Sequence, residues 1–236
     1  MGLPVPSIQD IAAIVLGNEA DVERALRDYC ERGGATFNYE PARKIGTKFL
    51  GGGLKAELAV GACFKIGSPS GHKQNAEVVR LLCDWAAGRE FRFYGIRTDF
   101  LPIGPRFAIP VPIQGYLVEK GAASFLWMQP RKGFNPNSAQ LSMIATCIRD
   151  VYGREDFEKV GLTILDFAAS MNDSERSLNV FGFEDFELLS RAELSELLGI
   201  FAAAYRSLVQ VGYTKPTRPS REKRPDERQS DFFEFP

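Results

Sequence analysis

The chain contains a single histidine, His72, and this limits the acid–base chemistry open to it. A serine or cysteine nucleophile that histidine activates needs the histidine beside it. The Gly-x-Ser-x-Gly turn that presents such a serine does not occur in the sequence. His72 stands in a Gly-His-Lys segment just before an expected helix, which is more typical of an exposed loop residue than of a base. We therefore predict no catalytic residue.

The spacing of the residues gives little support for a metal site or for a phosphate-binding site. One histidine and four scattered cysteines do not make a zinc site, so no metal and no cofactor is expected. Residues 67–73 run from an expected strand into an expected helix, the context in which helix amino termini bind phosphate. The spacing differs from GxxxxGK[ST], because the second glycine comes one residue early and Gln74 replaces the Ser or Thr.

Aromatic and basic residues alternate on the expected strands. Phe91 and Phe93 flank Arg92, and Phe125 and Trp127 alternate on a later strand. Single-strand nucleic-acid binders stack bases on such aromatics beside basic side chains. The same alternation is also expected of a core face, so both interpretations stay open. The predicted nucleic-acid-binding residues are Arg92, Arg97, Trp127, Arg131 and Lys132.

Composition changes at residue 214, where prolines and charged residues begin and no apolar residue follows until Phe232. Such a segment cannot bury enough apolar surface to offset its ordering entropy. We therefore expect one α+β domain over residues 1–213 and, over 214–236, a disordered linker with a C-terminal peptide motif.

The terminal peptide carries the most specific signal. Three phenylalanines within four positions, after a linker without apolar residues, predict docking on the chain's own domain or on a partner. The predicted partner-binding residues are Gln229, Asp231, Phe232, Phe233 and Phe235.

Residues 229–233, Gln-Ser-Asp-Phe-Phe, resemble the peptide with which bacterial proteins bind the replication sliding clamp: Gln, any residue, Ser or Asp, Leu or Met, then Phe. The resemblance implies polar contacts by the Gln229 amide and an apolar pocket for the last two side chains. Phe232 departs from the aliphatic residue of that pattern. The acidic, Phe-rich ending also resembles the tail tip of bacterial single-strand DNA-binding proteins.

The hydrophobic periodicity predicts the elements that would position these residues. Two short helices open the chain. They are followed by a strand at 56–66, a helix at 74–87, strands at 91–101, 107–118 and 123–129, a helix at 139–152, strands at 160–168 and 177–188, and a helix from 191 to about 209. The order from about residue 73 is α-βββ-α-ββ-α, preceded by a helical pair and an extra strand. This order favours an α+β fold with a mostly antiparallel sheet.

Over about residues 73–168 this order is similar to the core of the PD-(D/E)XK nuclease family. That family places an acid on the second strand and an acid-x-Lys on the third, to hold magnesium. Here the third strand ends Gln129-Pro130-Arg131, and the second carries no carboxylate before Glu119. Asp99 and Glu77 would be remnants, so the resemblance implies an inactive or divergent relative. The whole order also resembles the small secretion-chaperone fold, which implies a protein-binding module.

The amino-acid composition limits the classes of function that the protein can have. Lys and Arg total 29 against 30 Asp and Glu, so a globally basic nucleic-acid binder is excluded while a local basic patch is not. The chain shows no leader peptide and no apolar run that could span a bilayer, so we expect a cytoplasmic protein with no membrane partner and reduced cysteines.

These observations favour a non-enzymatic accessory protein of bacterial or mobile-element DNA replication or repair. The C-terminal peptide would tether it to a protein partner such as the sliding clamp, and the body would bind nucleic acid, such as a single strand, or a protein. A chaperone-like or immunity module is the alternative from another class, and an enzyme remains a third possibility. The sequence does not indicate an oligomeric state.

Overall fold

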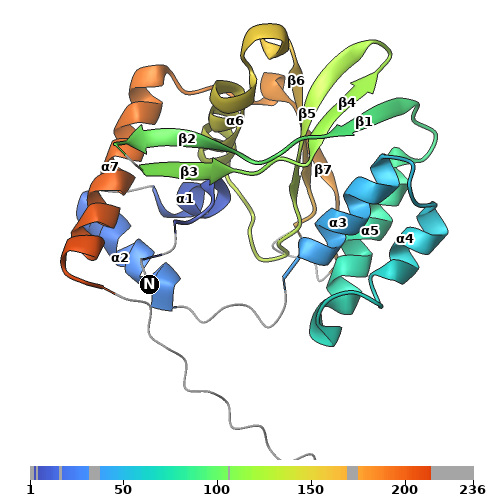
Figure 1. The fold of residues 1–236 in the computed structure, drawn as a ribbon, viewed down its shortest axis with the longest axis horizontal. Coiled ribbons are helices and arrows are strands. Elements are labelled where there is room, and N and C mark those ends of the chain that lie inside the picture. Colours follow the sequence, from blue (N-terminus) through green and yellow to red (C-terminus); the bar gives the residue numbers. More distant parts are fainter. Residues whose placement is uncertain are drawn as a thin grey trace, which may run out of the picture.

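The computed structural model describes residues 3, 5–15, 18–31, 38–105, 107–168 and 175–213 (Figure 1). They form an α+β fold with mostly antiparallel sheets, as the sequence predicted. The described helices are α1 (Ile8–Ile14), α2 (Glu19–Glu31), α3 (Glu40–Leu50), α4 (Ala56–Ala62), α5 (His72–Ala86), α6 (Ser138–Tyr152) and α7 (Arg191–Gln210). The strands are β1 (Phe91–Gly95), β2 (Asp99–Gly104), β3 (Phe107–Val111), β4 (Gly115–Glu119), β5 (Ala122–Gln129), β6 (Gly161–Asp166) and β7 (Asn179–Phe181).

A five-stranded sheet in the order β1-β4-β5-β6-β7 lies at the centre, and β2 and β3 pair separately as an antiparallel hairpin. Within the large sheet only β5 and β6 are parallel, and α6 connects them. Their register runs from Ser124 opposite Gly161 to Gln129 opposite Asp166. Both strands therefore end at the same edge of the sheet, which we call the carboxyl edge.

Two hydrophobic cores cover the two faces of this sheet. Successive side chains of a strand point to opposite faces, and along β5 Phe125 and Trp127 enter one core while Leu126 and Met128 enter the other. The first core includes residues of α1, α2, α6, α7 and the β2–β3 hairpin. The second includes residues of α3, α4 and α5. The alternation in β5 thus indicates a strand buried on both sides.

Helix caps confirm several of the predicted boundaries. Asn137 and Gln140 form a reciprocal capping box at the start of α6, and Ser190 and Glu193 form one at the start of α7. The Asn18 side chain accepts a hydrogen bond from the Asp21 N–H in the first turn of α2 (3.1 Å). Polar residues therefore locate these helix starts from sequence alone.

The predicted extra strand at 56–66 is wrong, because this segment contains α4. Ala59 and Cys63 are four residues apart and are both buried in the second core, which is helical spacing. The helix α3 was not predicted at all. Its buried residues are Pro41, Ala42, Ile45, Gly46 and Leu50, and basic residues between them obscure the apolar period.

The long strands predicted at 91–101 and 107–118 are each two shorter strands, β1 with β2 and β3 with β4. Pro112 follows β3 and has no N–H to donate to a ladder. Gly115 then begins β4 with φ +156°, a conformation that side-chain-bearing residues rarely adopt. The predicted strand at 177–188 is reduced to the three residues of β7.

Replacing Gly115 should be costly. A Cβ at this position would stand 2.1 Å from the Tyr94 carbonyl oxygen, a backbone atom. We expect Gly115→Ala to lower the free energy of unfolding by about 2 kcal/mol or more in urea titrations. Gly95 pairs with Gly115 in the ladder and has open space around its Cβ position, so Gly95→Ala is the matched control and should change stability little. Equal effects of the two substitutions would contradict this account.

Candidate functional site

Two of the aromatic residues considered for base stacking are inaccessible. Trp127 is 2% exposed and Phe125 is 1% exposed, and both pack in the first core. The prediction that Trp127 binds nucleic acid is therefore wrong. The sequence pattern was ambiguous because alternating aromatics serve a core face and a stacking face alike.

The predicted basic residues fall at two ends of the sheet. Arg92 lies near the start of β5, since it pairs with Val118, which pairs with Ala123. Arg97 follows the end of β1, is exposed and has its carbonyl near the Tyr152 hydroxyl at the end of α6 (3.4 Å), whereas Arg131 follows the end of β5 at the carboxyl edge. Lys132 is exposed beside Arg131. The structure therefore does not unite these residues in one patch.

A pair of stacked tyrosines on the sheet, of which Tyr94 is exposed and Tyr116 half-buried, is a candidate for base stacking. Tyr94 of β1 is 41% exposed and stacks on Tyr116 of β4, with ring centroids 5.0 Å apart and planes at 17°. Phe157 packs edge-on against Tyr116 (5.6 Å) and supports the stack from the first core. Arg92 stands two residues before Tyr94, so both side chains project from the same face of β1.

This group, which we call the Tyr94 platform, borders a shallow concavity of about 550 Å³. Arg89, Arg92, Tyr94 and Val118 are among its lining residues. Arg89 lies over the Trp85 ring (4.0 Å) and donates to both Glu119 carboxylate oxygens (2.5 and 3.2 Å). The hydrogen bonds from Arg89 lower the pKa of Glu119, so this ion pair keeps its charge and Arg92 is left as the cation beside the platform.

A network of polar side chains lies at the carboxyl edge, at the opposite end of β5. Arg176, whose side chain is 1% exposed, is at its centre. Its Nη1 donates to the carbonyls of Pro130 and Phe167 (both 2.8 Å), just past the ends of β5 and β6. Its Nε donates to Glu77 of α5 (3.3 Å) and its Nη2 to the Tyr39 hydroxyl (2.5 Å). Arg176 thus joins the two strand ends to α5.

Gln129 and Asp166, the last residues of β5 and β6, are buried and bonded to each other through Gln129 Nε2 (3.1 Å). The Ala168 N–H donates to the same Asp166 oxygen (3.1 Å). Burial raises the pKa of Asp166, although these hydrogen bonds and Arg176 oppose the shift. The Gln9 amide of α1 donates to Gln129 Oε1 (3.0 Å), so α1 is tied to the same point.

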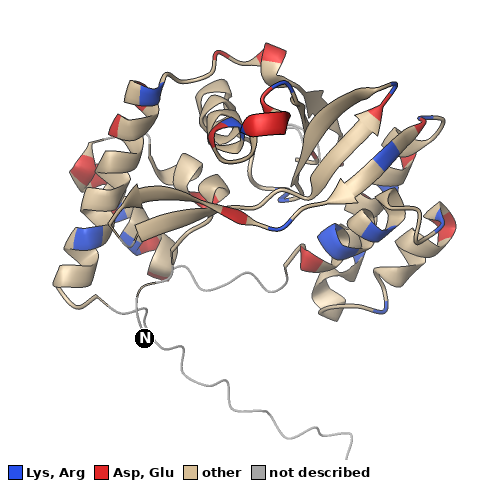
Figure 2. Cartoon of the chain, turned by 45° about the horizontal axis from the view of Figure 1, so that its top comes forward, with Lys and Arg blue, Asp and Glu red and all other residues tan. Residues whose placement is uncertain are grey.

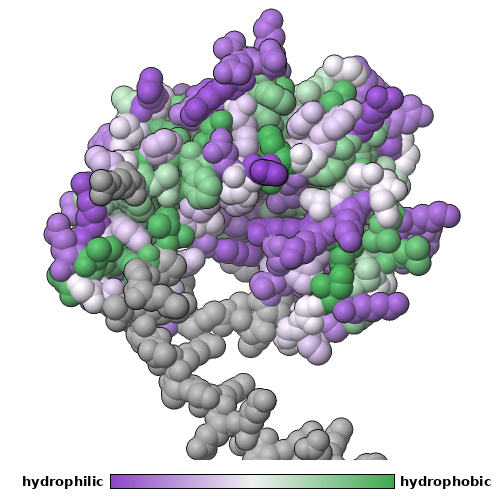
Figure 3. Space-filling model, viewed as in Figure 1, coloured by the Kyte–Doolittle hydropathy of each residue, from purple (hydrophilic) through white to green (hydrophobic). Residues whose placement is uncertain are grey.

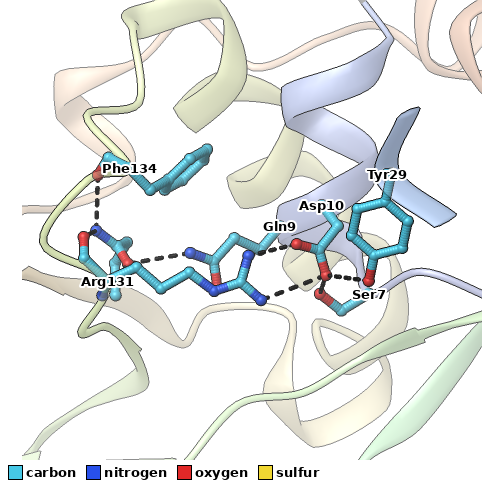
Figure 4. Close-up of polar contacts among 7 residues, drawn as sticks. Ser7, Gln9, Asp10, Tyr29, Arg131 and Phe134 are labelled. Carbon is cyan, nitrogen blue, oxygen red and sulfur yellow. Dashed lines mark hydrogen bonds and ion pairs between the residues drawn. The ribbon is translucent and has the colours of Figure 1, made fainter. Parts of the chain in front are cut away.

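Asp10 of α1 binds Arg131 directly, as Figure 4 shows. Arg131 donates to both carboxylate oxygens, while the Ser7 hydroxyl (2.8 Å) and the Tyr29 hydroxyl (3.4 Å) also donate to Asp10. Burial raises the pKa of Tyr29 to about 12, with the Asp10 charge adding to the effect. Arg131 keeps 43% of its side chain exposed, so the guanidinium is held on one side and open on the other.

The remaining chemistry-bearing residues lie apart from these groups. His72 contacts the Gly67 carbonyl (3.3 Å) and the edge of the Phe64 ring. The four cysteines are buried, and burial raises the pKa of Cys63 and of Cys83 to about 11. Asp99 is exposed and caps the Phe100 N–H (2.8 Å). The predicted partner-binding residues Gln229, Asp231, Phe232, Phe233 and Phe235 lie outside the described residues.

The Arg176 network predicts a large stability effect. Arg176→Met would leave Glu77 and two buried carbonyls without their donor, and we expect the free energy of unfolding to fall by about 3 kcal/mol or more in urea titrations. Arg80→Met, which breaks an exposed pair with Asp84 on the same α5, should stay within about 0.5 kcal/mol of the wild type. A loss from Arg176→Met no larger than that of Arg80→Met would contradict the role given to Arg176.

The raised pKa of Asp166 predicts that the stability of the fold depends on pH with a defined sign. Because its pKa is raised in the folded state, ionisation of Asp166 opposes folding, and its stabilising contribution is lost as pH rises through the folded-state pKa. Asp166→Asn keeps an oxygen for Gln129 and Ala168, so the variant should be more stable than the wild type at neutral pH. This advantage should shrink as the pH of the urea titration is lowered toward 4. An advantage that stays constant with pH would contradict the assignment, and Glu196→Gln at an exposed position of α7 controls for the loss of one negative charge.

Comparisons with known proteins give no information on this fold, on the Tyr94 platform or on the Arg176 network. No family model, no curated protein and no solved structure matches the chain. In the described part of the chain, no helix is long and apolar enough to cross a membrane. Within the same residues, no group of three or more His, Cys, Asp or Glu side chains is placed to hold a metal ion.

Proposed function

We propose that this protein is a non-enzymatic accessory factor of bacterial or mobile-element DNA replication or repair. Its folded body binds single-stranded nucleic acid at the Tyr94 platform, and its peptide at 229–235 docks on a clamp-like partner. The observation that carries the first half is the exposed Tyr94 ring, which stacks on Tyr116 and has Arg92 on the same face of β1. A base that stacks on Tyr94 would place its phosphate within reach of a cation, which is the usual arrangement in single-strand binders.

The two halves of this proposal support each other energetically. A tether of about fifteen residues would hold the body near the partner at an effective concentration on the order of millimolar. One stacked base contributes about 1–3 kcal/mol, which alone gives weak binding. Tethering would make such a weak platform sufficient at a DNA-bound clamp.

The order α5-β1-β4-β5-α6-β6, with the β2–β3 hairpin inserted, is compatible with an inactive relative of the PD-(D/E)XK nucleases. The polar residues that precede β4 and end β5 are amides with structural hydrogen bonds. Gln114, just before β4, accepts a hydrogen bond from the Met128 N–H (2.6 Å), and Gln129 joins the carboxyl-edge network. A DNA-binding body without magnesium chemistry accords with the accessory role proposed above.

The nucleic-acid half is tested with a fluorescent oligothymidine in anisotropy titrations. We expect Tyr94→Ala to weaken binding by about fivefold or more, and Arg92→Gln to weaken it and to flatten its dependence on salt concentration. Arg80→Gln removes an exposed charge from α5 and should change the affinity by less than about twofold. Absence of salt-dependent binding by the wild type would overturn this half of the proposal.

The tether half is tested by binding of a bacterial sliding clamp to the intact chain and to a version ending at Arg228. We expect binding by the intact chain only, and loss of binding on combined replacement of Phe232 and Phe233 by alanine. Ser230→Ala changes the unrestricted position of the motif and should leave binding intact. Equal binding by the intact and shortened chains would contradict the motif assignment.

A protein-binding module is the second candidate, because an apolar surface is exposed around α4. Leu58, Phe64 and Ile66 are among the exposed large hydrophobic residues, and Figure 3 shows hydrophobic surface on this side of the molecule. A chaperone-like module would use such a surface to form a dimer. Light scattering that finds a monomer at all concentrations would remove that candidate.

A further inference from the structure

The apolar surface around α4 is built from the outward side of this helix and the turn that follows it. Ala59 and Cys63 of this segment face the second core. Leu58, Phe64 and Ile66 are 61%, 53% and 47% exposed, and we call these three residues the α4 surface. They are three of the eight large hydrophobic residues exposed in the described part of the chain, and they lie within nine positions. Such a cluster, unlike single exposed apolar residues, is typical of an interaction site.

The α4 surface is held in a defined shape. The Phe64 N–H donates to the Gly61 carbonyl at the end of α4 (3.2 Å), and the His72 ring packs edge-on against the Phe64 ring (6.1 Å between centroids). Gly61 stands three residues from both Leu58 and Phe64, and the space where its Cβ would lie is open. Residues three apart are neighbours on a helical surface, so bare backbone lies between two apolar side chains. This position suits an inserted aromatic ring.

The helices around the α4 surface are basic. Residues 40–86, which include α3, α4 and α5, contain seven Lys and Arg against four Asp and Glu, and Figure 2 shows Lys and Arg on these helices at the right of the view. Two of the acids pair with basic residues of the same range, and Glu77 pairs with Arg176, which leaves Glu57. In residues 54–73, three exposed lysines form no ion pair with a described residue: Lys55, Lys65 and Lys73. The α4 surface therefore has basic neighbours.

The peptide at 229–235 complements this surface in both respects. It contains three phenylalanines, two acids and no basic residue. Its rings suit the apolar α4 surface, while the carboxylates of Asp231 and Glu234 suit the exposed lysines around it. The linker at 214–228 contains six Lys and Arg against three Asp and Glu, so the basic helices would repel it. Attraction to the α4 surface is therefore a property of the peptide and not of the linker.

The linker is long enough for the peptide to reach the α4 surface. Figure 1 shows the end of α7 and α4 on opposite sides of the fold. A domain of about 210 residues has a radius of gyration of about 17 Å, which corresponds to roughly 45 Å across. The fifteen residues of the linker extend to about 50 Å. A tether of this length holds the peptide near the α4 surface at an effective concentration on the order of millimolar.

We propose that the peptide at 229–235 docks on the α4 surface of its own chain and that this contact competes with the partner of the peptide. The docking goes beyond the proposed function, whereas the competition rests on the proposed tether to a clamp-like partner. Both contacts use Phe232 and Phe233, so the peptide occupies one of them at a time. With an effective concentration of about 1 mM and a dissociation constant of about 0.1 mM for the internal contact, docking weakens clamp binding about tenfold.

Docking is tested in the full chain without a clamp. The four cysteines of the chain are buried, so Ser230→Cys supplies the accessible thiol to which a benzophenone maleimide is attached for photo-cross-linking. We expect cross-links within one chain to residues 54–73, identified by mass spectrometry. Cross-links that miss residues 54–73, or no cross-links, would overturn the proposal. Cross-linked dimers would also overturn it, and would assign the α4 surface to a second copy of the chain.

Variants then locate the contact. Phe64→Ser should lower the yield of cross-links to residues 54–73 by about threefold or more, whereas Phe100→Ser of β2, where the ring is equally exposed at 53%, should not. Lys65→Glu should lower the yield as well, and Lys159→Glu, which reverses an exposed charge before β6, should leave it unchanged. The two lysine substitutions change solvent-facing side chains, so they keep the fold intact even where Phe64→Ser does not. Equal effects within both pairs would overturn the site.

Clamp binding tests the competition. We expect Phe64→Ser in the full chain to tighten clamp binding by up to about tenfold, and Phe100→Ser to leave it unchanged. An unchanged affinity of Phe64→Ser would overturn the competition. Cross-links to residues 54–73 in a chain that binds no clamp would contradict the tether half of the proposed function and leave the docking standing. Clamp binding without these cross-links would overturn the docking and leave the tether standing.

Discussion

The buried guanidinium of Arg176 is the interaction on which the carboxyl edge depends. It comes from the segment before β7, and it bonds the chain just beyond β5, the chain just beyond β6, and α5. Such a cation is tolerated in the interior only where its donors are matched by acceptors. Glu77, Tyr39 and two carbonyls supply them, so the edge is rigid because its polar groups are satisfied.

The parallel pairing of β5 and β6 determines where the polar residues gather. Parallel strands end at the same edge, so Gln129 and Asp166 become neighbours although 36 residues separate them in sequence order. The helices α1 and α5 approach this edge from the two cores on either face of the sheet, and they add Asp10 and Glu77. Antiparallel pairing across the rest of the sheet leaves β1 at its border, where Tyr94 and Arg92 are exposed. The topology thus produces two chemically different regions of the sheet: the polar carboxyl edge, and the border at β1 with its exposed tyrosine and arginine.

Local signals predicted part of this fold. Capping residues located α6 and α7, and the turn at Lys120 and Gly121, both with positive φ, made the β4–β5 hairpin predictable. The α3 and α4 region was missed because alternation over a few apolar residues fits a strand and a short helix equally well. The exposure of Tyr94 and the burial of Trp127 depend on which helices cover which part of the sheet. The alternation of apolar and polar residues along a strand does not indicate where the helices lie.

The candidate sites were still less predictable. Arg131 was selected as a basic residue after a strand, but its ion pair with Asp10 joins two residues 121 positions apart. Long-range contacts therefore define these groups. Local sequence patterns indicate which residue types are present but not which of them lie together.

The ion pair between Asp10 and Arg131 also bears on how the chain is made. The apolar face of α1, with Ile8 and Ile11 fully buried in the finished fold, leaves the ribosome before the residues that receive it. At typical rates of synthesis, roughly ten seconds pass before the end of β5 is available. During that interval the amino-terminal helices have no completed sheet to cover, so they depend on each other or on cellular chaperones to avoid aggregation. Assembly of the carboxyl edge is thus later than the synthesis of α1, and it ends the exposure of the apolar face of that helix.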